Sequence, residues 1–276
     1  MLKKLYMTLK LVPRLMRAVV GGLIAVAAIS AHADMTTGLL GWYGFENNVN
    51  DSSGGGRNGA ATSLTYAAGR VGQAGSFNNA TSFVEVSGLA GVLPGGGDAR
   101  TVSFWVNPSS TADNGNVVSW GQTNANQRFS VLMEGGGELR MIGEGNDHSS
   151  GFFLPQGVWT HVAVSYDGST LLFYVNGSIQ DTKLGVVLAT DNAQPLRIGI
   201  NAQGRNDEFF GGLIDEVRVY GRVLTPSDVT EVFNSTTVAG SASTAVSVPT
   251  LGEWGLMMLS TLLLGVLWIQ RRRWLQ

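Results

Sequence analysis

The stretch WTHVAVSYDGSTLLFYVNG, at residues 159–177, decides the fold that we expect. It contains two runs rich in β-branched and aromatic side chains, which favour β-strands. The pair Asp167-Gly168 separates the two runs, and Asn176-Gly177 follows the second. Such pairs are strong signals for the tight turns of β-hairpins. The stretch therefore predicts consecutive antiparallel strands.

Similar signals recur along residues 34–234, so the predicted architecture is an all-β antiparallel sandwich or jelly roll. One helix is well marked, because Thr225 is a good N-cap, Pro226 suits the first helical position and Asp228 faces the positive end of the helix dipole. We expect that helix to end at Phe233. Further strands are expected at 101–106, 195–200 and 212–220.

The charge distribution separates the two ends of the chain from its body. The 276 residues include 18 Lys and Arg and 20 Asp and Glu, but eight of the basic residues lie before residue 18 or at 271–273. Residues 34–270 therefore keep ten basic residues against all 20 acidic ones, a net charge of −10. A body this acidic repels phosphate backbones, which argues against nucleic acid as a partner. The absence of cysteine excludes disulfides and Cys-ligated metal sites.

The N-terminus has the three parts of a secretory signal peptide. Residues 1–17 carry five positive charges and no negative one, residues 18–29 are an uncharged apolar run, and Ala31-His32-Ala33 has the small residues of a signal peptidase site. As a helix the apolar run would be about 18 Å long, too short for a hydrocarbon core of about 30 Å. We expect signal peptidase to cleave after Ala33, and the alternative is a retained N-terminal anchor.

The C-terminus has the features of a linker followed by a membrane span. Residues 235–247 are small or polar and uncharged, which predicts a flexible linker. A mostly apolar stretch at about 254–269 predicts a transmembrane helix. The positive-inside rule places the arginines at 271–273 in the cytoplasm. The body of the protein would then lie outside the inner membrane.

A short motif precedes this apolar stretch, and an arginine cluster ends it. The residues concerned are Val248, Pro249, Thr250, Leu251, Glu253, Trp254, Gly255, Arg271, Arg272 and Arg273. In this order, residues 248–276 resemble the IPTL-type C-terminal sorting signals of Gram-negative bacteria. The resemblance implies recognition by an exosortase-type transpeptidase and transfer to the cell surface or extracellular matrix, after at least transient insertion in the membrane. Gly252 stands where the pattern has Ser, and a plain tail anchor is the alternative.

Several motifs of the body occur in the order found in one known family. They are GWYGFE at 41–46, Asp51 and Asn58 among glycine-rich turns, TVSFWV at 101–106, the stretch 159–177, and FGGLIDEVRVY at 210–220 with the helix after it. Together they resemble the laminin-G-like domains of the concanavalin A-like jelly-roll superfamily. The resemblance implies two antiparallel sheets of about six or seven strands each, one of them concave.

Asp215 is the strongest candidate for a metal ligand. Alternation along 212–220 places it on the face of Leu213, Val217 and Val219, which is expected to be buried, and a buried carboxylate needs a proton, a cation or several donors. The resemblance implies one structural Ca²⁺, an ion that binds carboxylate, amide and main-chain oxygens. The alternative is that Asp215 accepts backbone N–H groups and that Asp51 makes an Asx turn. The further ligands implied by the resemblance are Glu46, Asp51 and Asn58.

We expect no catalytic residues, so the protein is predicted not to be an enzyme. The Glu-x-Asp-x-x-Glu arrangement of the superfamily's glycosidases is absent, the acidic residues within 134–147 lie among glycines and are expected to form a loop, and His161 is expected to pack within a strand. The predicted function is binding of a carbohydrate or matrix polymer. The alternatives are a structural or adhesion protein that binds other proteins, and a cryptic glycosidase. Aromatic side chains expected on loops, where they would stack on sugar rings, are Trp120, Phe152, Phe153, Phe209 and Phe210.

Overall fold

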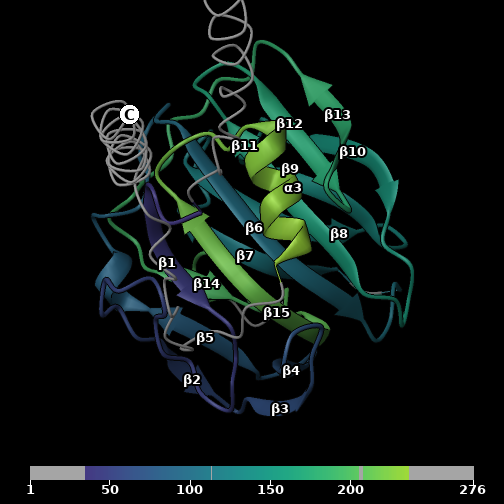
Figure 1. The fold of residues 1–276 in the computed structure, drawn as a ribbon. Helices are drawn as coiled ribbons and strands as arrows, with labels where there is room; N and C mark the ends of the chain where they lie inside the picture. The colour runs from purple at the N-terminus through teal and green to yellow at the C-terminus, as the bar shows by residue number, and fades with distance from the viewer. Residues whose placement is uncertain (1–34, 113, 205–207, 236–276) are drawn as a thin grey trace, which may run out of the picture. The chain divides into compact units, whose positions relative to one another are not determined.

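The computed structural model describes residues 35–112, 114–204 and 208–235, and in this part of the chain two antiparallel sheets pack face to face (Figure 1). All of these residues belong to the first of the two units into which the chain divides, 1–240 and 241–276. The predicted all-β sandwich is therefore confirmed. The predicted signal peptide, most of the linker, the apolar span and the sorting motif lie outside the described residues.

Sheet A contains the strands that the sequence marks most clearly. The hairpins predicted from 159–177 are present, and β6 and β15 extend the expected strands by one or two residues at their ends. In spatial order, with β1 also pairing with β15, sheet A consists of β13 (Ser178–Lys183), β12 (Leu171–Val175), β11 (Thr160–Tyr166), β6 (Arg100–Pro108), β15 (Gly211–Tyr220), β4 (Gln73–Asn78), β3 (Thr65–Ala68) and β1 (Leu39–Tyr43).

One prediction about sheet B, the second sheet of the sandwich, was wrong. The segment 134–147, expected to be a loop, contains a strand whose inward residues Leu139 and Met141 alternate with the outward, charged Glu138 and Arg140. The nearby glycines form the turns on either side of this strand. In spatial order, sheet B consists of β10 (His148–Phe153), β9 (Glu138–Ile142), β8 (Arg128–Glu134), β7 (Gly115–Gly121), β14 (Leu196–Ile198), β5 (Phe83–Val86) and β2 (Ala60–Thr62).

The main hydrophobic core fills the space between the two sheets. Val102, Phe104 and Val106 of β6 all face it, as their alternation predicts, and they meet inward residues of sheet B such as Trp120 and Phe129. Burial of such side chains contributes about 1.5–3 kcal/mol each and is the main stabilising term of the domain. A short 3₁₀ helix, η1 (Ser87–Leu89), follows β5 and adds Leu89 to this core.

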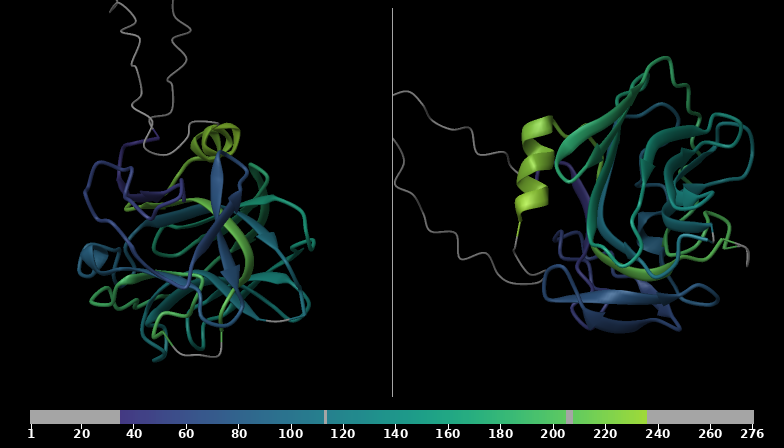
Figure 2. Two further views of the ribbon diagram at one scale, coloured as in Figure 1. Left: turned by 90° about the horizontal axis from the view of Figure 1, so that it is seen from below. Right: turned by 90° about the vertical axis from the view of Figure 1, so that its right-hand side faces the viewer.

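The helix α3 (Pro226–Asn234) covers part of the outer face of sheet A (Figure 2). It begins as predicted, because the Thr225 side chain accepts a hydrogen bond from the Asp228 amide at 3.2 Å and the Asp228 carboxylate accepts one from the Thr225 amide at 2.9 Å. Val229 and Val232 bury a second, smaller cluster against Tyr220. Among the described residues, no helix is long and apolar enough to cross a membrane.

Candidate functional site

An irregularity in β15 brings together the acidic residues of sheet A. The pairing of β15 with β6 shifts register between Asp215 and Arg218, and Glu216 has a φ of +55°. On its other edge, β15 pairs with β4 at 211–214 and with β1 at 217–220. The β-bulge thus lies where one neighbouring strand ends and the other begins.

This bulge corrects the predicted faces of β15. Ile214 joins Val217 and Val219 in the main core, because the extra residue at the bulge shifts the alternation by one position. Asp215 pairs directly with Trp105, which stacks on Phe233 of α3, so Asp215 lies on the outer face of sheet A. It is nevertheless completely buried.

Asp215 and Glu46 hold the same tight turn, at 69–73. One carboxylate oxygen of Asp215 accepts hydrogen bonds from the amides of Arg70 and Val71, at 2.8 and 2.9 Å. One carboxylate oxygen of Glu46 accepts a hydrogen bond from the amide of Gln73 at 3.1 Å. Two candidates that are far apart in the sequence therefore anchor one short segment, because both accept hydrogen bonds from its backbone N–H groups.

Glu216 lies beside them and is buried, as Asp215 is, whereas Glu46 is half-buried; Glu216 was not among the residues selected from the sequence. Its Oε2 accepts a hydrogen bond from the indole nitrogen of Trp42 at 2.9 Å and forms an ion pair with Arg218. The guanidinium of Arg218 in turn lies 4.5 Å from the centre of the Trp42 ring. The one feature of the sequence that could have indicated Glu216 is its position next to Asp215. Strict alternation places neighbouring residues on opposite faces of a strand, so it does not predict a bulge that brings both side chains into the same region.

Each of these three carboxylates leaves its second oxygen buried and without a hydrogen-bond partner among the described residues. The atoms are Oε1 of Glu46, Oδ1 of Asp215 and Oε1 of Glu216. Burial, together with the nearby charge of Glu216, raises the pKa of Asp215 to about 7. Burial also raises the pKa of Glu216. Unsatisfied anionic oxygens of this kind suit a hard cation that binds oxygen ligands.

The side chains alone do not supply enough ligands for a metal ion. Within the described residues, no group of three or more His, Asp or Glu side chains is arranged to hold a metal ion. A calcium ion would therefore need main-chain oxygens in addition to the carboxylates, which is usual for Ca²⁺.

Asp51 and Asn58 have a different role. Asp51 accepts hydrogen bonds from the amides of Trp42, Ser53 and Arg57, at 3.1, 2.9 and 3.0 Å, so both of its carboxylate oxygens are used within its own region. The Asn58 side chain accepts a hydrogen bond from the Asp51 amide at 2.9 Å. These two residues brace the loop at 51–58, and the structure places only Glu46 and Asp215 of the four predicted ligands on the turn at 69–73.

The aromatic candidates need correction. Trp120 and Phe210 are fully buried and Phe209 is 6% exposed, so the prediction that these three present their rings to a ligand is wrong. Trp120 lies on β7, facing the core against Phe129, rather than on a loop. Phe152 on β10 is half-buried against the core. Phe153, at the end of the edge strand β10, is 57% exposed and is the one candidate of the five whose ring is largely accessible.

Neither described histidine forms a catalytic pair. His161 is buried with its Nε2 2.9 Å from the hydroxyl of Ser103, and burial, together with the charge of Arg218, lowers its pKa to about 3. This agrees with the predicted packing role. His148 contacts the Asn146 side chain at 2.7 Å, while the Asp147 carboxylate accepts hydrogen bonds from two amides of its own turn.

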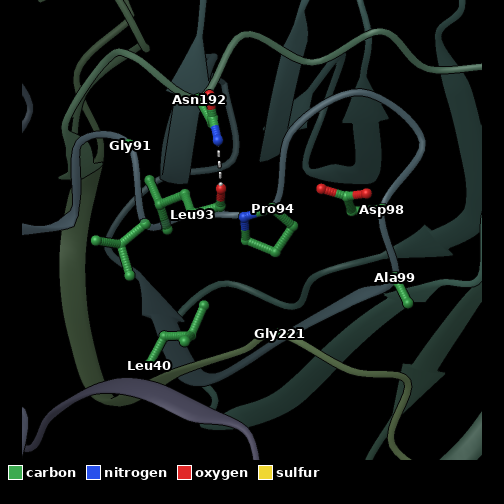
Figure 3. A pocket seen from close by; sticks show the side chains of 9 residues that line it. Leu40, Gly91, Leu93, Pro94, Asp98, Ala99, Asn192 and Gly221 are labelled. Carbon is green, nitrogen blue, oxygen red and sulfur yellow. Dashed lines mark hydrogen bonds between the residues drawn. The ribbon is translucent and has the colours of Figure 1, made fainter.

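A cavity of about 590 Å³ opens at one end of the sandwich (Figure 3). The sequence analysis did not predict it, because four separate segments supply its wall. Figure 3 shows Pro94 between the side chains of Asn192 and Asp98, with Leu40 and Gly221 across from them. The lining residues are Leu40, Gly91, Val92, Leu93, Pro94, Asp98, Ala99, Asn192 and Gly221.

Residues 78–230, more than half of the chain, match the family described as the concanavalin A-like lectin/glucanases superfamily (Laminin_G_3). The chain belongs to this superfamily. Its two antiparallel sheets are the fold that membership implies. Residues 246–273 match the IPTL-CTERM motif, which agrees with the resemblance found in the tail.

Known proteins similar to this member of the superfamily include binding and adhesion proteins. Domain 4 of AbnA, an extracellular arabinanase from Geobacillus stearothermophilus, was solved in complex with arabinotriose; it is 27% identical, with a TM-score of 0.58 over 70% of this chain and 97% of that one. The binding domain of Paraclostridial Mosquitocidal Protein 1 is 21% identical, with a TM-score of 0.59 over 72% of this chain and 52% of that one, which shows the fold alone.

A curated relative is much longer than this chain. Adhesion G-protein coupled receptor V1 of Danio rerio is 28% identical in an alignment of 190 residues, which covers 63% of this chain and 3% of the receptor. This chain therefore spans a small fraction of that relative. Taken together, the comparisons show a lectin-like domain that is similar to parts of binding and adhesion proteins.

Proposed function

We propose that this protein is an exported, surface-displayed binding module for a carbohydrate or an extracellular matrix polymer, and that it is not a catalyst. The observation that carries the proposal is the similarity to domain 4 of the arabinanase, which was solved in complex with arabinotriose and which this chain matches over 97% of its length. The superfamily description, lectin and glucanase, is compatible with a saccharide ligand.

Surface display is supported by the two ends of the chain. The N-terminal 33 residues have the pattern of a signal peptide, and 246–273 match the IPTL-CTERM motif. An exosortase-type transpeptidase is the proposed processing partner. Cell fractionation tests this step: the processed protein belongs in the envelope or the extracellular fraction, whereas an intact 276-residue product in the cytosol contradicts it.

Binding of another protein is the second candidate function, and the similarity to an adhesion receptor favours it. The full chain, purified in a mild detergent, is tested on an array of oligosaccharides and on an array of extracellular matrix proteins. Binding to saccharides supports the first candidate. Binding to matrix proteins without binding to any saccharide supports the second and contradicts the first. Release of reducing sugar from a bound polysaccharide contradicts the noncatalytic assignment.

We also propose that the domain holds one structural Ca²⁺ at Glu46 and Asp215, with Glu216 beside them. The three unsatisfied carboxylate oxygens support this proposal, because each would otherwise remain buried without a partner among the described residues. Bound there, the ion would neutralise the buried charge and tie β15 to the turn at 69–73. Asp51 and Asn58 are not part of the proposed site, since their oxygens serve the loop at 51–58.

A further inference from the structure

The cavity in Figure 3 is built on hydrogen bonds between its own wall segments. The amide of Gly91 donates to the Asn192 carbonyl at 2.6 Å, and the Asn192 side-chain amide donates to the Leu93 carbonyl at 3.1 Å. Gly96 and Thr190 bond each other through both backbone groups, at 2.8 and 3.3 Å. These contacts join the segment before β6 to the segment before β14, so the two sides of the cavity are fixed relative to each other.

A buried arginine holds the same wall from inside the core. Arg100 is fully buried, and its guanidinium donates to the carbonyls of Gly95, Gly96 and Asp98, at 3.2, 2.8 and 2.9 Å. It also donates to the hydroxyl of Thr190 at 2.9 Å. These four acceptors of the buried cation are all neutral groups, and burial lowers the pKa of Arg100 to about 10.

The aromatic residues around Arg100 extend this support. Its guanidinium lies 5.9 Å from the ring centre of Trp120 and 5.4 Å from those of Phe129 and Tyr166. The Trp120 indole nitrogen donates to the Pro94 carbonyl at 3.2 Å. Burying a cation is costly, and core packing alone would be achieved by an apolar side chain. The guanidinium of Arg100 and the indole of Trp120 instead hold carbonyl groups of the segment 94–98 in place. A binding site requires such preorganisation of its wall.

The groups that face the cavity have the chemistry of a saccharide site. Asp98 is exposed and uses one carboxylate oxygen for the Gly95 amide at 3.2 Å, and among the described residues that line the cavity it carries the single charge. A carboxylate accepts up to four hydrogen bonds, so it retains capacity for ligand hydroxyls. Asn192 uses one of the two hydrogens on its amide nitrogen for Leu93. Val92, 39% exposed, offers apolar surface for the C–H face of a sugar ring, while Pro94 lines the cavity as a buried residue.

We propose that this cavity is the saccharide-binding site, and that it takes a neutral sugar unit whose hydroxyls bond Asp98 and Asn192 while its ring packs on Val92. The volume of about 590 Å³ lies within the usual range of roughly 300–1,000 Å³ for small-ligand pockets. An acidic sugar is disfavoured, because its carboxylate would face that of Asp98. Arg100 is a positioning residue, since it acts through the carbonyls it holds. This inference rests on the proposed function and locates its site.

The test compares variants of the full chain on one array that carries arabinotriose and cellotriose as neutral probes and trigalacturonate as an acidic probe. Val92→Asp adds a negative charge at an exposed position and leaves the hydrogen bonds of the wall in place. Asp98→Asn keeps an oxygen acceptor for the Gly95 amide and removes the charge. We expect each change to weaken binding of the neutral probe at least about tenfold. Phe153→Ala tests the exposed aromatic residue on β10 as an alternative site, and the control is Leu184→Ala, at a position that is 79% exposed and does not line the cavity, which should leave binding unchanged.

The outcomes separate the site from the function. If the wild-type chain binds no saccharide, the proposed function fails, and this inference fails with it. If the wild type binds a neutral probe but Val92→Asp and Asp98→Asn bind equally well, the function stands and the cavity is not its site. Loss of binding in Phe153→Ala alone would move the site to β10. Tighter binding of trigalacturonate than of the neutral probes overturns the predicted ligand class. Equal melting temperatures of the variants exclude a general loss of folding.

Discussion

Two short segments of this domain, at 51–58 and at 69–73, are each held by carboxylates that accept backbone N–H groups, yet they differ in what remains unsatisfied. Asp51 bonds three amides with its two oxygens, and its loop is partly exposed to water. Asp215 and Glu46 bond three amides with one oxygen each, and their second oxygens are buried without a partner among the described residues.

This difference in hydrogen bonding shows which carboxylate has partners for both of its oxygens without a bound cation. At 51–58 the donors to the Asp51 carboxylate are backbone amides of the chain itself. Water can supply hydrogen bonds to any acceptor capacity that this carboxylate has left. At 69–73 the turn is held by the buried Asp215 and the half-buried Glu46, next to Glu216, whose charge Arg218 pairs, and burial raises the pKa of Asp215 to about 7. Such a site is stable only if the charge is removed by protons or balanced by a cation.

The largest expected effect is therefore that of calcium removal. A ligand present at 100 times its dissociation constant stabilises the folded state by about 2.7 kcal/mol. For a domain of this size that corresponds to a melting temperature roughly 5–10 °C lower in excess EGTA than in millimolar calcium. Differential scanning calorimetry of the full chain measures the shift, with EGTA plus excess magnesium as the control for ion type. An unchanged melting temperature contradicts the calcium site.

Two variants test whether the segments at 51–58 and 69–73 differ in their dependence on calcium. Asp215→Asn retains an oxygen acceptor for the amides of Arg70 and Val71 but loses the charge, so its melting temperature should no longer depend on calcium. Asp51→Ala removes an acceptor from three amides and should cost about 1.5–3 kcal/mol, yet it should keep the full response to calcium. If Asp51→Ala loses that response, the two segments do not differ as proposed.

Much of the fold could be predicted from the sequence because the relevant signals are local. The alternation at 101–106, the turns at 167–168 and 176–177 and the cap at Thr225 each depend on neighbouring residues, and each is confirmed. The strand β9 was missed for an equally local reason. It is five residues long and lies among glycines, and its outward positions are charged, so its period-2 pattern is short and weak.

The candidate site was predictable only in part, because it depends on tertiary relations. Asp215 was selected from the alternation along 212–220 and Glu46 by resemblance, and both reach one turn. The bulge that gives Glu216 a positive φ and moves Ile214 into the core has no alternation signal. The burial of Trp120 follows from the inward side of β7, a strand that the sequence analysis did not identify. The cavity is built from separate segments and backbone carbonyls, which composition does not reveal.

A smaller effect is expected from pH, through a group on the same face of sheet A as Asp215. Burial lowers the pKa of His161 to about 3 in the folded state, against about 6.5 in the unfolded chain. Below pH 6.5 the unfolded chain binds the additional proton, so stability falls as pH falls, by about 1.4 kcal/mol per pH unit. Chemical denaturation in saturating calcium at pH 7.5 and 5.5 should show this loss, and His161→Gln should reduce it. An equal pH dependence of the wild type and the variant excludes His161 as the cause.

The smallest expected effect comes from replacing glycines that have a positive φ. Two such glycines distinguish backbone strain from a clash with a carboxylate. Gly54 and Gly72 both have positive φ, +87° and +59°, so alanine at either position should cost about 1 kcal/mol in backbone strain. A Cβ atom on Gly54 would meet nothing within 4 Å, whereas one on Gly72 would lie closer than 3.0 Å to the carboxylate of Glu46. Gly72→Ala should therefore be the more destabilising change, and it should also weaken calcium binding, as measured by titration calorimetry. Equal losses of stability, with calcium affinity unchanged in both variants, would show that Glu46 can move away from the turn at 69–73 without consequence, and that it does not belong to the calcium site.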